Sequence, residues 1–165
     1  MTGDYMESDP LCWRFRDRKE EISYLPIPIK ELIPQVQPMQ FVDTLICVGD
    51  RSAIVETEIK ADCPMLDEKG ILSESAFVEI IAQASAAHNG FRTRHKKDGR
   101  TGYLLGAKNI KALRQVRVGD RLTTTLRKEA RLGDFGVISG RICRGDECVA
   151  EGEVKVYDAA KEVTE

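Results

Sequence analysis

The sequence SESAFVEIIAQASAAHN, residues 73–89, decides the fold. Ser73 is a suitable N-cap, and Asn89 followed by Gly90 is a typical helix end. Apolar residues recur at helical spacing along this stretch and just beyond it, at Leu72, Phe77, Ile80, Ala84, Ala87 and Phe91. More apolar residues fill its other sides, whereas a surface helix is apolar on one side only. The stretch therefore predicts a central helix over 73–89 that is covered on several faces.

Segments on both sides of this helix have the composition of β-strands. Two are expected before it, at 41–48 and 52–59, joined by the turn signal Gly49-Asp50. Four are expected after it, with glycine-aspartate turns between them, at 102–113, 121–131, 135–144 and 147–157. Two strands, one buried helix and four strands predict an α+β fold in which an antiparallel sheet curls around the helix. This order is typical of the hot-dog fold.

The hot-dog domain is expected to span residues 29–158. Residues 1–28 are expected to be a partly mobile N-terminal extension, because chain termini are often mobile and this one mixes both charge signs. The end of this extension, 24–29, should be extended, since proline restricts the residue before it. Residues 159–165 are expected to be a C-terminal tail. A curled sheet leaves an exposed edge that a second copy covers, so we expect a homodimer.

The composition excludes several classes of function. The chain has 25 Lys plus Arg, 27 Asp plus Glu and a formal net charge of −2, which disfavours a dedicated nucleic-acid binder. No apolar run approaches the roughly 18 residues of a membrane helix, and the N-terminus lacks the apolar core of a secretory signal. The 5 cysteines form no CxxC pair. We therefore expect buried free thiols, no metal, no redox cofactor and a cytoplasmic protein.

Glu79 interrupts the apolar character of the predicted helix. Gln83 follows one helical turn later on the same face. A carboxyl group among apolar side chains is costly unless it is hydrogen-bonded or functional, and a role in proton transfer would explain it. A solvated helix edge, or a carboxylate held by a backbone amide, would explain it as well. The pattern alone leaves these alternatives open.

Three segments of the chain together resemble the 3-hydroxyacyl carrier-protein dehydratases of fatty-acid synthesis. Residues 65–84 resemble the active-site segment of that family, 34–43 its opening segment, and 118–120 its later strand and turn. The similarity covers roughly residues 30–158. It is greatest to the divergent branch found in aryl-polyene-type clusters, in which an Asp-Glu-x-Gly sequence precedes the helix. This chain has Asp67-Glu68-Lys69-Gly70 at that place.

The resemblance implies acid–base chemistry on an acyl thioester. In the family, a histidine and a helix carboxylate remove the α-proton and help the β-hydroxyl group to leave, while the helix N-terminus polarises the thioester carbonyl. Glu79 matches the carboxylate, and Met65 occupies the position of the histidine. The opening segment of relatives often carries Pro-His, where this chain has Pro34-Gln35. The implied substrate-binding residues are Met65, Gly70, Ile71, Leu72, Ser73, Ala82 and Gln83.

The two histidines of the chain do not replace the one that the family uses. His88 lies 9 residues after Glu79, about two and a half turns of helix, and so faces the opposite side. His95 is expected to face solvent. Three functions therefore stay open: a dehydratase-like lyase that relies on Glu79, a thioesterase with Glu79 as base or nucleophile, and a non-catalytic acyl-binding or scaffold subunit. The third function suits a heteromer with an active hot-dog partner.

The expected ligand is an acyl thioester, carried by coenzyme A or by an acyl carrier protein. A carrier protein presents an acidic helix, which a basic surface complements. We expect this docking surface just after the predicted helix, at Arg92, Arg94, Lys96 and Lys97. A solvated loop explains the same charges. A second candidate surface is formed by Arg114, Arg117 and Arg121.

Overall fold

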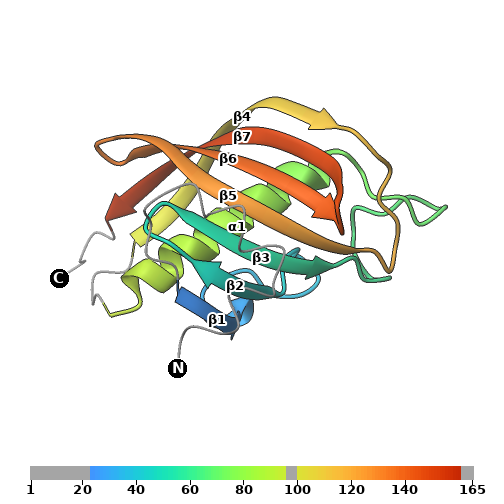
Figure 1. Cartoon of the computed structure of the whole chain (residues 1–165), viewed down its shortest axis with the longest axis horizontal. Coiled ribbons are helices and arrows are strands. Elements are labelled where there is room, and N and C mark those ends of the chain that lie inside the picture. The colour runs from blue at the N-terminus through green and yellow to red at the C-terminus, as the bar shows by residue number, and fades with distance from the viewer. Residues whose placement is uncertain (1–22, 96–99, 161–165) are drawn as a thin grey trace.

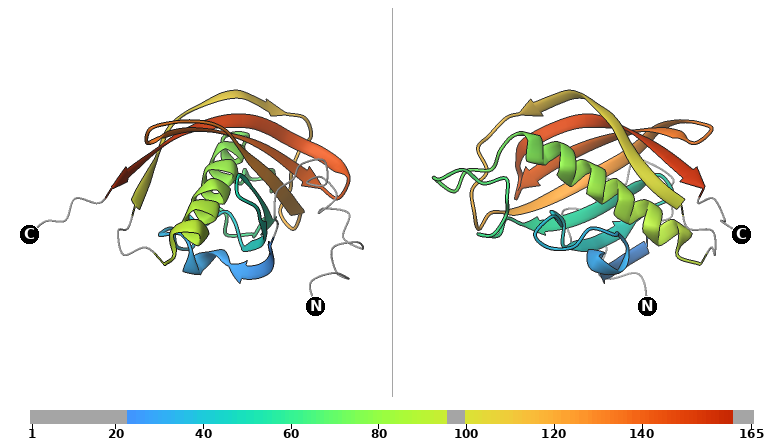
Figure 2. Two further views of the ribbon diagram at one scale, coloured as in Figure 1. Left: turned by 60° about the vertical axis from the view of Figure 1, so that its left-hand side comes forward. Right: turned by 180° about the vertical axis from the view of Figure 1, so that it is seen from behind.

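In the part of the chain that the structure describes, one antiparallel sheet of seven strands wraps around one long helix (Figures 1 and 2). The computed structural model describes residues 23–95 and 100–160. The helix, α1, spans Ser75–Thr93, and a short 3-10 helix, η2, spans Ile29–Glu31. The strands are β1 (Ser23–Pro28), β2 (Thr44–Val48), β3 (Ser52–Glu58), β4 (Arg100–Ala112), β5 (Arg121–Leu132), β6 (Phe135–Arg144) and β7 (Glu147–Ala160). Their order across the sheet is β1-β2-β3-β5-β6-β7-β4, which leaves β1 and β4 at the edges.

The prediction of an antiparallel sheet around a central helix is confirmed. The four strands expected after the helix are present, and β6 has the predicted bounds of 135–144. Side chains alternate across the sheet as the pleat requires: Ala150, Gly152 and Val154 of β7 are buried toward α1, while Lys155 is exposed. The first predicted strand is shorter than expected: β2 begins at Thr44, and the backbone N–H of Phe41 donates to the side chain of Gln83 in α1 instead of to a neighbouring strand.

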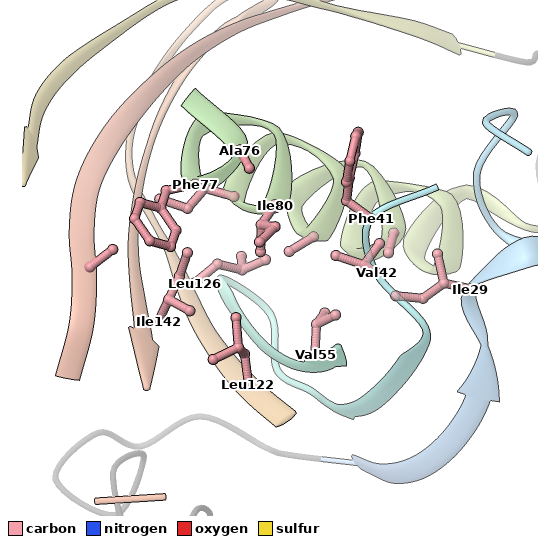
Figure 3. Packing of buried hydrophobic residues seen from close by; sticks show 14 of the residues in the cluster. Ile29, Phe41, Val42, Val55, Ala76, Phe77, Ile80, Leu122, Leu126 and Ile142 are labelled. Carbon is pink, nitrogen blue, oxygen red and sulfur yellow. The ribbon is translucent and has the colours of Figure 1, made fainter. Parts of the chain in front are cut away.

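The core lies between α1 and the inner face of the sheet (Figure 3). Phe77 and Ile80 point from α1 toward a group of sheet residues, Leu122, Leu126 and Ile142. These side chains are at most 2% exposed, and burial of one such side chain contributes about 1.5–3 kcal/mol. Gly140 lets the helix approach, since a Cβ there would lie 2.7 Å from Cγ1 of Ile81. The helix is thereby fixed in position relative to the sheet.

The limits of α1 differ from the prediction of 73–89. The helix begins at Ser75 after Glu74, and Ser73 is no N-cap, because its hydroxyl contacts that of Ser75 at 2.9 Å instead. At the other end the helix passes through Gly90 and continues to Thr93. A Cβ at Gly90 would collide with the carbonyl oxygen of Leu32, so this glycine serves a close approach of the chain rather than a helix end.

The sheet extends beyond the expected domain limits of 29 and 158 at both ends. The extended conformation predicted for 24–29 is present up to Pro28, within β1, which pairs with β2, whereas Ile29 begins η2. Proline cannot donate to a strand ladder, and Pro26 and Pro28 are tolerated here because β1 is an edge strand. At the C-terminal end, β7 continues to Ala160. Residues 1–22 and 161–165, including most of the expected extension and tail, lie outside the described residues.

The prediction of buried thiols holds for two of the four described cysteines, since Cys63 and Cys148 are only half-buried. Cys47 and Cys143 are buried, and Cys143 lies opposite Cys148 across the β6–β7 hairpin. Within residues 23–95 and 100–160, no helix combines the length and apolar character needed to cross a membrane.

Candidate functional site

A pocket of about 470 Å³ lies along one face of α1. This volume is within the range of small-molecule sites, about 300–1,000 Å³. Its helix side is lined by Glu79, Ala82, Gln83, Ser85, Ala86, Asn89, Gly90 and Thr93. Its other walls come from the segment after η2, the C-terminal ends of β5 and β7, and the N-terminal ends of β6 and β4. These segments are far apart in the sequence, so the pocket exists only in the folded chain.

The helix side of the pocket follows from helical geometry. Residues three and four apart share a face, so Glu79, Ala82, Gln83 and Ala86 form one stripe. Glu79 is half-buried, whereas Gln83 is only 2% exposed. The sequence placed Ala82 and Gln83 beside Glu79, and the structure brings all three together at one pocket wall.

Gln83 fastens the opening segment of the domain to α1. Its Oε1 accepts a hydrogen bond from the backbone N–H of Phe41 at 2.8 Å, and its Nε2 donates to the carbonyl oxygen of Met39 at 2.9 Å. The same Nε2 lies 3.4 Å from Oε2 of Glu79. The amide therefore has a structural role, and it also orients the neighbouring carboxylate in the pocket.

Gln35 lines the same pocket as Glu79, which the sequence did not establish. Its Oε1 is buried and has no hydrogen-bond partner among the residues that the structure describes. A buried polar atom without a partner is unusual in a folded protein. The signal for this residue was present in the resemblance, because Gln35 stands where relatives often have histidine.

Met65 and the loop before α1 do not line this pocket. Met65 packs against the hydrophobic core, and its carbonyl oxygen accepts a hydrogen bond from the N–H of Ser73 at 2.8 Å. Leu72 is 4% exposed and belongs to the core. Gly70 and Ile71 contact the chain around Arg117: the Gly70 carbonyl accepts from the N–H of Val118, and Ile71 forms a bridge with Arg117. The predicted substrate-binding residues thus divide into a pocket group and a loop group.

The two histidines lie away from Glu79, in agreement with the helical spacing. His88 is fully buried on the opposite face of α1, with Nε2 2.9 Å from the carbonyl oxygen of Gly49. Its Nδ1 has no partner among the described residues, so the neutral ring donates from Nε2. Burial, together with the positive charge of Lys128, lowers the pKa of His88 to about 4. His95 is exposed.

Two of the predicted docking residues, Arg92 and Arg94, lie in the described part of the chain, and both contact neighbouring side chains. Arg92 forms an ion pair with Asp50 at 2.6 Å, and the Arg94 guanidinium lies 3.6 Å from the centroid of the Phe91 ring. Lys96 and Lys97 lie outside the described residues. The second surface, Arg114, Arg117 and Arg121, is exposed beside the loop that precedes α1.

The far end of the pocket carries charged residues that the sequence did not single out. Lys128 of β5 and Asp158 of β7 both line it, as do Arg131 and Asp134. Alternation along the two strands would have placed Lys128 and Asp158 on the inner face. It could not show that they share a pocket with Glu79, which is far from both in the sequence.

Around Glu79 the pocket therefore offers a carboxylate for proton transfer, the amides of Gln35 and Gln83 for hydrogen bonding, and small helix residues such as Ala82 and Ala86. A carboxylate beside an elongated cavity suits proton transfer on the head of a chain-like ligand.

Comparison with known proteins identifies the family of the chain. The family model described as "ApeP-like: ApeP dehydratase" matches residues 27–165. A 3-hydroxyacyl-[acyl-carrier-protein] dehydratase FabZ from Natranaerobius thermophilus is 28% identical over 132 residues, covering 76% of this chain and 91% of that protein.

Solved structures establish the hot-dog fold. The dehydratase heterocomplex ApeI:P from Xenorhabdus doucetiae matches with a TM-score of 0.75 and 22% identity, covering 82% of this chain and 93% of that chain. A probable thioesterase from Bartonella henselae matches with a TM-score of 0.54 and 12% identity, covering 68% of this chain and 94% of that chain. Because the family model spans most of the sequence, the chain belongs to the ApeP-like dehydratase family.

Proposed function

We propose that this member of the ApeP-like dehydratase family binds 3-hydroxyacyl thioesters in the cytoplasm and removes water from them, with Glu79 as the acid–base group. The observation that carries the proposal is the position of Glu79, which faces a pocket along α1 and is oriented by Gln83. The FabZ relatives, which are dehydratases of 3-hydroxyacyl carrier-protein substrates, support the choice of substrate.

Dehydration needs one base and one acid, and a single carboxylate can serve as both in turn. The Glu79 carboxylate takes the α-proton, and the electron pair of that C–H bond forms the new double bond. The C–O bond at the β-carbon then breaks, and the proton held by Glu79 goes to the departing hydroxyl group to make water. General acid–base catalysis of this kind contributes about 10²–10⁴-fold.

A second hot-dog chain, either another copy or a related protein, is the proposed partner at β4. This strand is at the edge of the sheet and exposes Tyr103 (53%), Leu104 (41%) and Leu105 (54%). An apolar edge strand of this kind is normally covered. Tyr103 and Leu104 also line the pocket, so a chain that pairs with β4 lies next to the site. The ApeI:P neighbour is a heterocomplex, which supports a related chain as partner.

A carrier protein is the proposed donor of the thioester, and the two basic surfaces lie at opposite ends of α1. A helix of 19 residues is about 28 Å long. If the thioester enters beside 70–73, charge reversal at Arg117 should weaken carrier binding and lower its salt sensitivity, whereas Arg94→Glu should have little effect. Binding of an acyl carrier protein at several salt concentrations measures both. The reverse result would assign docking to the surface at Arg92 and Arg94.

Hydrolysis of the thioester is the second candidate reaction, supported by the thioesterase among the fold neighbours. An intact-mass time course separates the two. Purified protein is mixed with 3-hydroxyacyl and saturated acyl thioesters on both coenzyme A and a carrier protein, with Glu79→Gln as the control. Loss of the mass of one water from the hydroxyacyl species, absent in Glu79→Gln, is the expected result. Release of free thiol would replace dehydration by hydrolysis, and binding without change would make the chain a non-catalytic subunit.

A further inference from the structure

The pocket continues well beyond the group that performs the proposed chemistry. Its helix side runs from Glu79 to Thr93, which is about 21 Å along the helix axis. The walls between these ends are mostly small or apolar, as Ala82, Ala86 and Val156 illustrate. A ligand whose reacting head lies at Glu79 therefore extends its tail toward the other end.

Charged side chains line that other end. Lys128 and Asp158 project from the inner faces of β5 and β7 and line the pocket, and Oδ1 of Asp158 lies over Gly102, where a Cβ would come within 3.3 Å of it. Burial lowers the pKa of the Lys128 ammonium, while the charge of Asp158 opposes that change. The two charges influence each other, yet among the described residues neither side chain forms a hydrogen bond or ion pair with the other.

Among the residues that line this end of the pocket, positive and negative charges are equal in number. Arg131 is exposed and its Nε donates to the carbonyl oxygen of Gly133 at 2.9 Å, so it is already engaged. Asp134 also lines the pocket and has partners of its own. Two cations and two carboxylates therefore surround this end. A plain hydrocarbon end would desolvate Lys128 without accepting a hydrogen bond from it, and a carboxylate end would meet Asp158 and Asp134 as like charges.

We propose that the far end of the pocket recognises an uncharged hydrogen-bonding group at the tail of the acyl chain, such as a hydroxyl, with Lys128 donating to its oxygen and Asp158 accepting its proton. The inference rests on the proposed function only in taking an acyl thioester as the ligand. It assigns Lys128 and Asp158 as specificity-determining residues.

Binding of three acyl-pantetheine thioether analogues to the full chain tests this assignment. The analogues have equal chain length and end in a methyl, a hydroxyl or a carboxylate group. They contain the pantetheine arm that coenzyme A and carrier proteins share, and they cannot react. Calorimetry should show the hydroxyl-ended analogue binding about tenfold more tightly than the other two, in keeping with hydrogen bonds to charged groups.

Two variants and two controls sharpen the test. Lys128→Met keeps the apolar stem and should abolish the preference for the hydroxyl end, and Asp158→Asn should reduce it. Lys155→Met removes an exposed lysine of β7 and should keep the preference. Glu79→Gln should keep it too, because the analogues do not react.

The outcomes separate this inference from the proposed function. Equal binding of all three analogues, or a preference for methyl or carboxylate, would overturn the role of Lys128 and leave acyl binding intact. A preference that survives Lys128→Met in a folded variant would also overturn it. Failure of every analogue to bind would remove acyl-thioester binding itself, and the inference with it.

Discussion

Two faces of α1 each carry an ionisable side chain, but the surroundings of the two side chains differ. On one face, His88 is fully buried and its ring nitrogen lies 2.9 Å from the carbonyl oxygen of Gly49. On the other, Glu79 is half-buried at a pocket wall and lies 3.4 Å from the amide of Gln83. Both are ionisable groups in a helix whose buried residues include Phe77, Ile80 and Ile81. The residue type that performs most acid–base catalysis is thus a packing element here, and the carboxylate is the accessible group.

The difference shows that the position relative to the pocket, more than the residue type, determines which group a ligand can reach. His88 has no path to a ligand, whereas Glu79 faces a pocket that runs along the helix. The following predictions test this contrast between the closed face of α1, which carries His88, and the open face, which carries Glu79.

The largest effect is expected for Glu79→Gln. Dehydration should fall by about 10²–10⁴-fold, because the amide cannot take or give the proton. Stability should change little, since the group is not in the core. His88→Gln is the matched variant on the closed face and should keep the turnover rate of the folded protein. Single-turnover assays and thermal melts check both variants, and equal losses of turnover would contradict the contrast.

The next effect is the dependence of stability on pH. The pKa of His88 is lowered to about 4 from 6.5, so between these values the unfolded chain binds a proton that the folded chain does not. The free energy of unfolding should therefore decrease as the pH falls through this window, by about 3 kcal/mol in total. Above the window, the contribution of the neutral His88 to stability is fully present.

Denaturant titrations at several pH values measure this loss. In His88→Gln, which keeps a donor for Gly49 but does not titrate, the slope between these pH values should be much smaller. An unchanged slope would show that another group causes the dependence.

A smaller loss is expected for Gln83→Ala on the open face. The buried N–H of Phe41 loses its acceptor, which costs about 1–3 kcal/mol. Activity should fall too, because the amide no longer orients Glu79. Ser75→Ala, on the same helix but exposed, should change stability by less than about 0.5 kcal/mol. Equal stability of the two variants would argue against a stabilising role for the hydrogen bonds between Gln83 and the backbone of Phe41 and Met39.

The smallest effect is a gain. Gln35 lines the pocket with Glu79, and Met65 packs against the core instead. Gln35→His should therefore raise the dehydration rate by about tenfold, a modest value because no surrounding groups hold the new ring. Met65→His should raise it less. The gain should disappear when Glu79→Gln is added, and a larger gain from Met65→His would favour the alignment with the dehydratases over the pocket geometry.

Much of the fold was predictable because it depends on local periodicity. The bounds of β6 and the central position of α1 follow from patterns within each segment. The errors arose where a distant residue overruled the local signal. Gly90 is a helix-ending residue by type, but it lies inside α1 because the carbonyl of Leu32 packs against it. β1 contains two prolines and still joins the sheet, because β2 offers an edge.

The candidate site was predictable only along α1, where the spacing of Glu79, Ala82 and Gln83 places them on one face. The sequence by itself determined the strand and helix pattern, the family resemblance and the separation of His88 from Glu79. Only the tertiary structure decided that Gln35, Lys128 and Asp158 share a pocket with Glu79. The physical reason is that periodicity relates residues within one segment, whereas a pocket is formed by segments whose contacts depend on how the sheet closes around the helix.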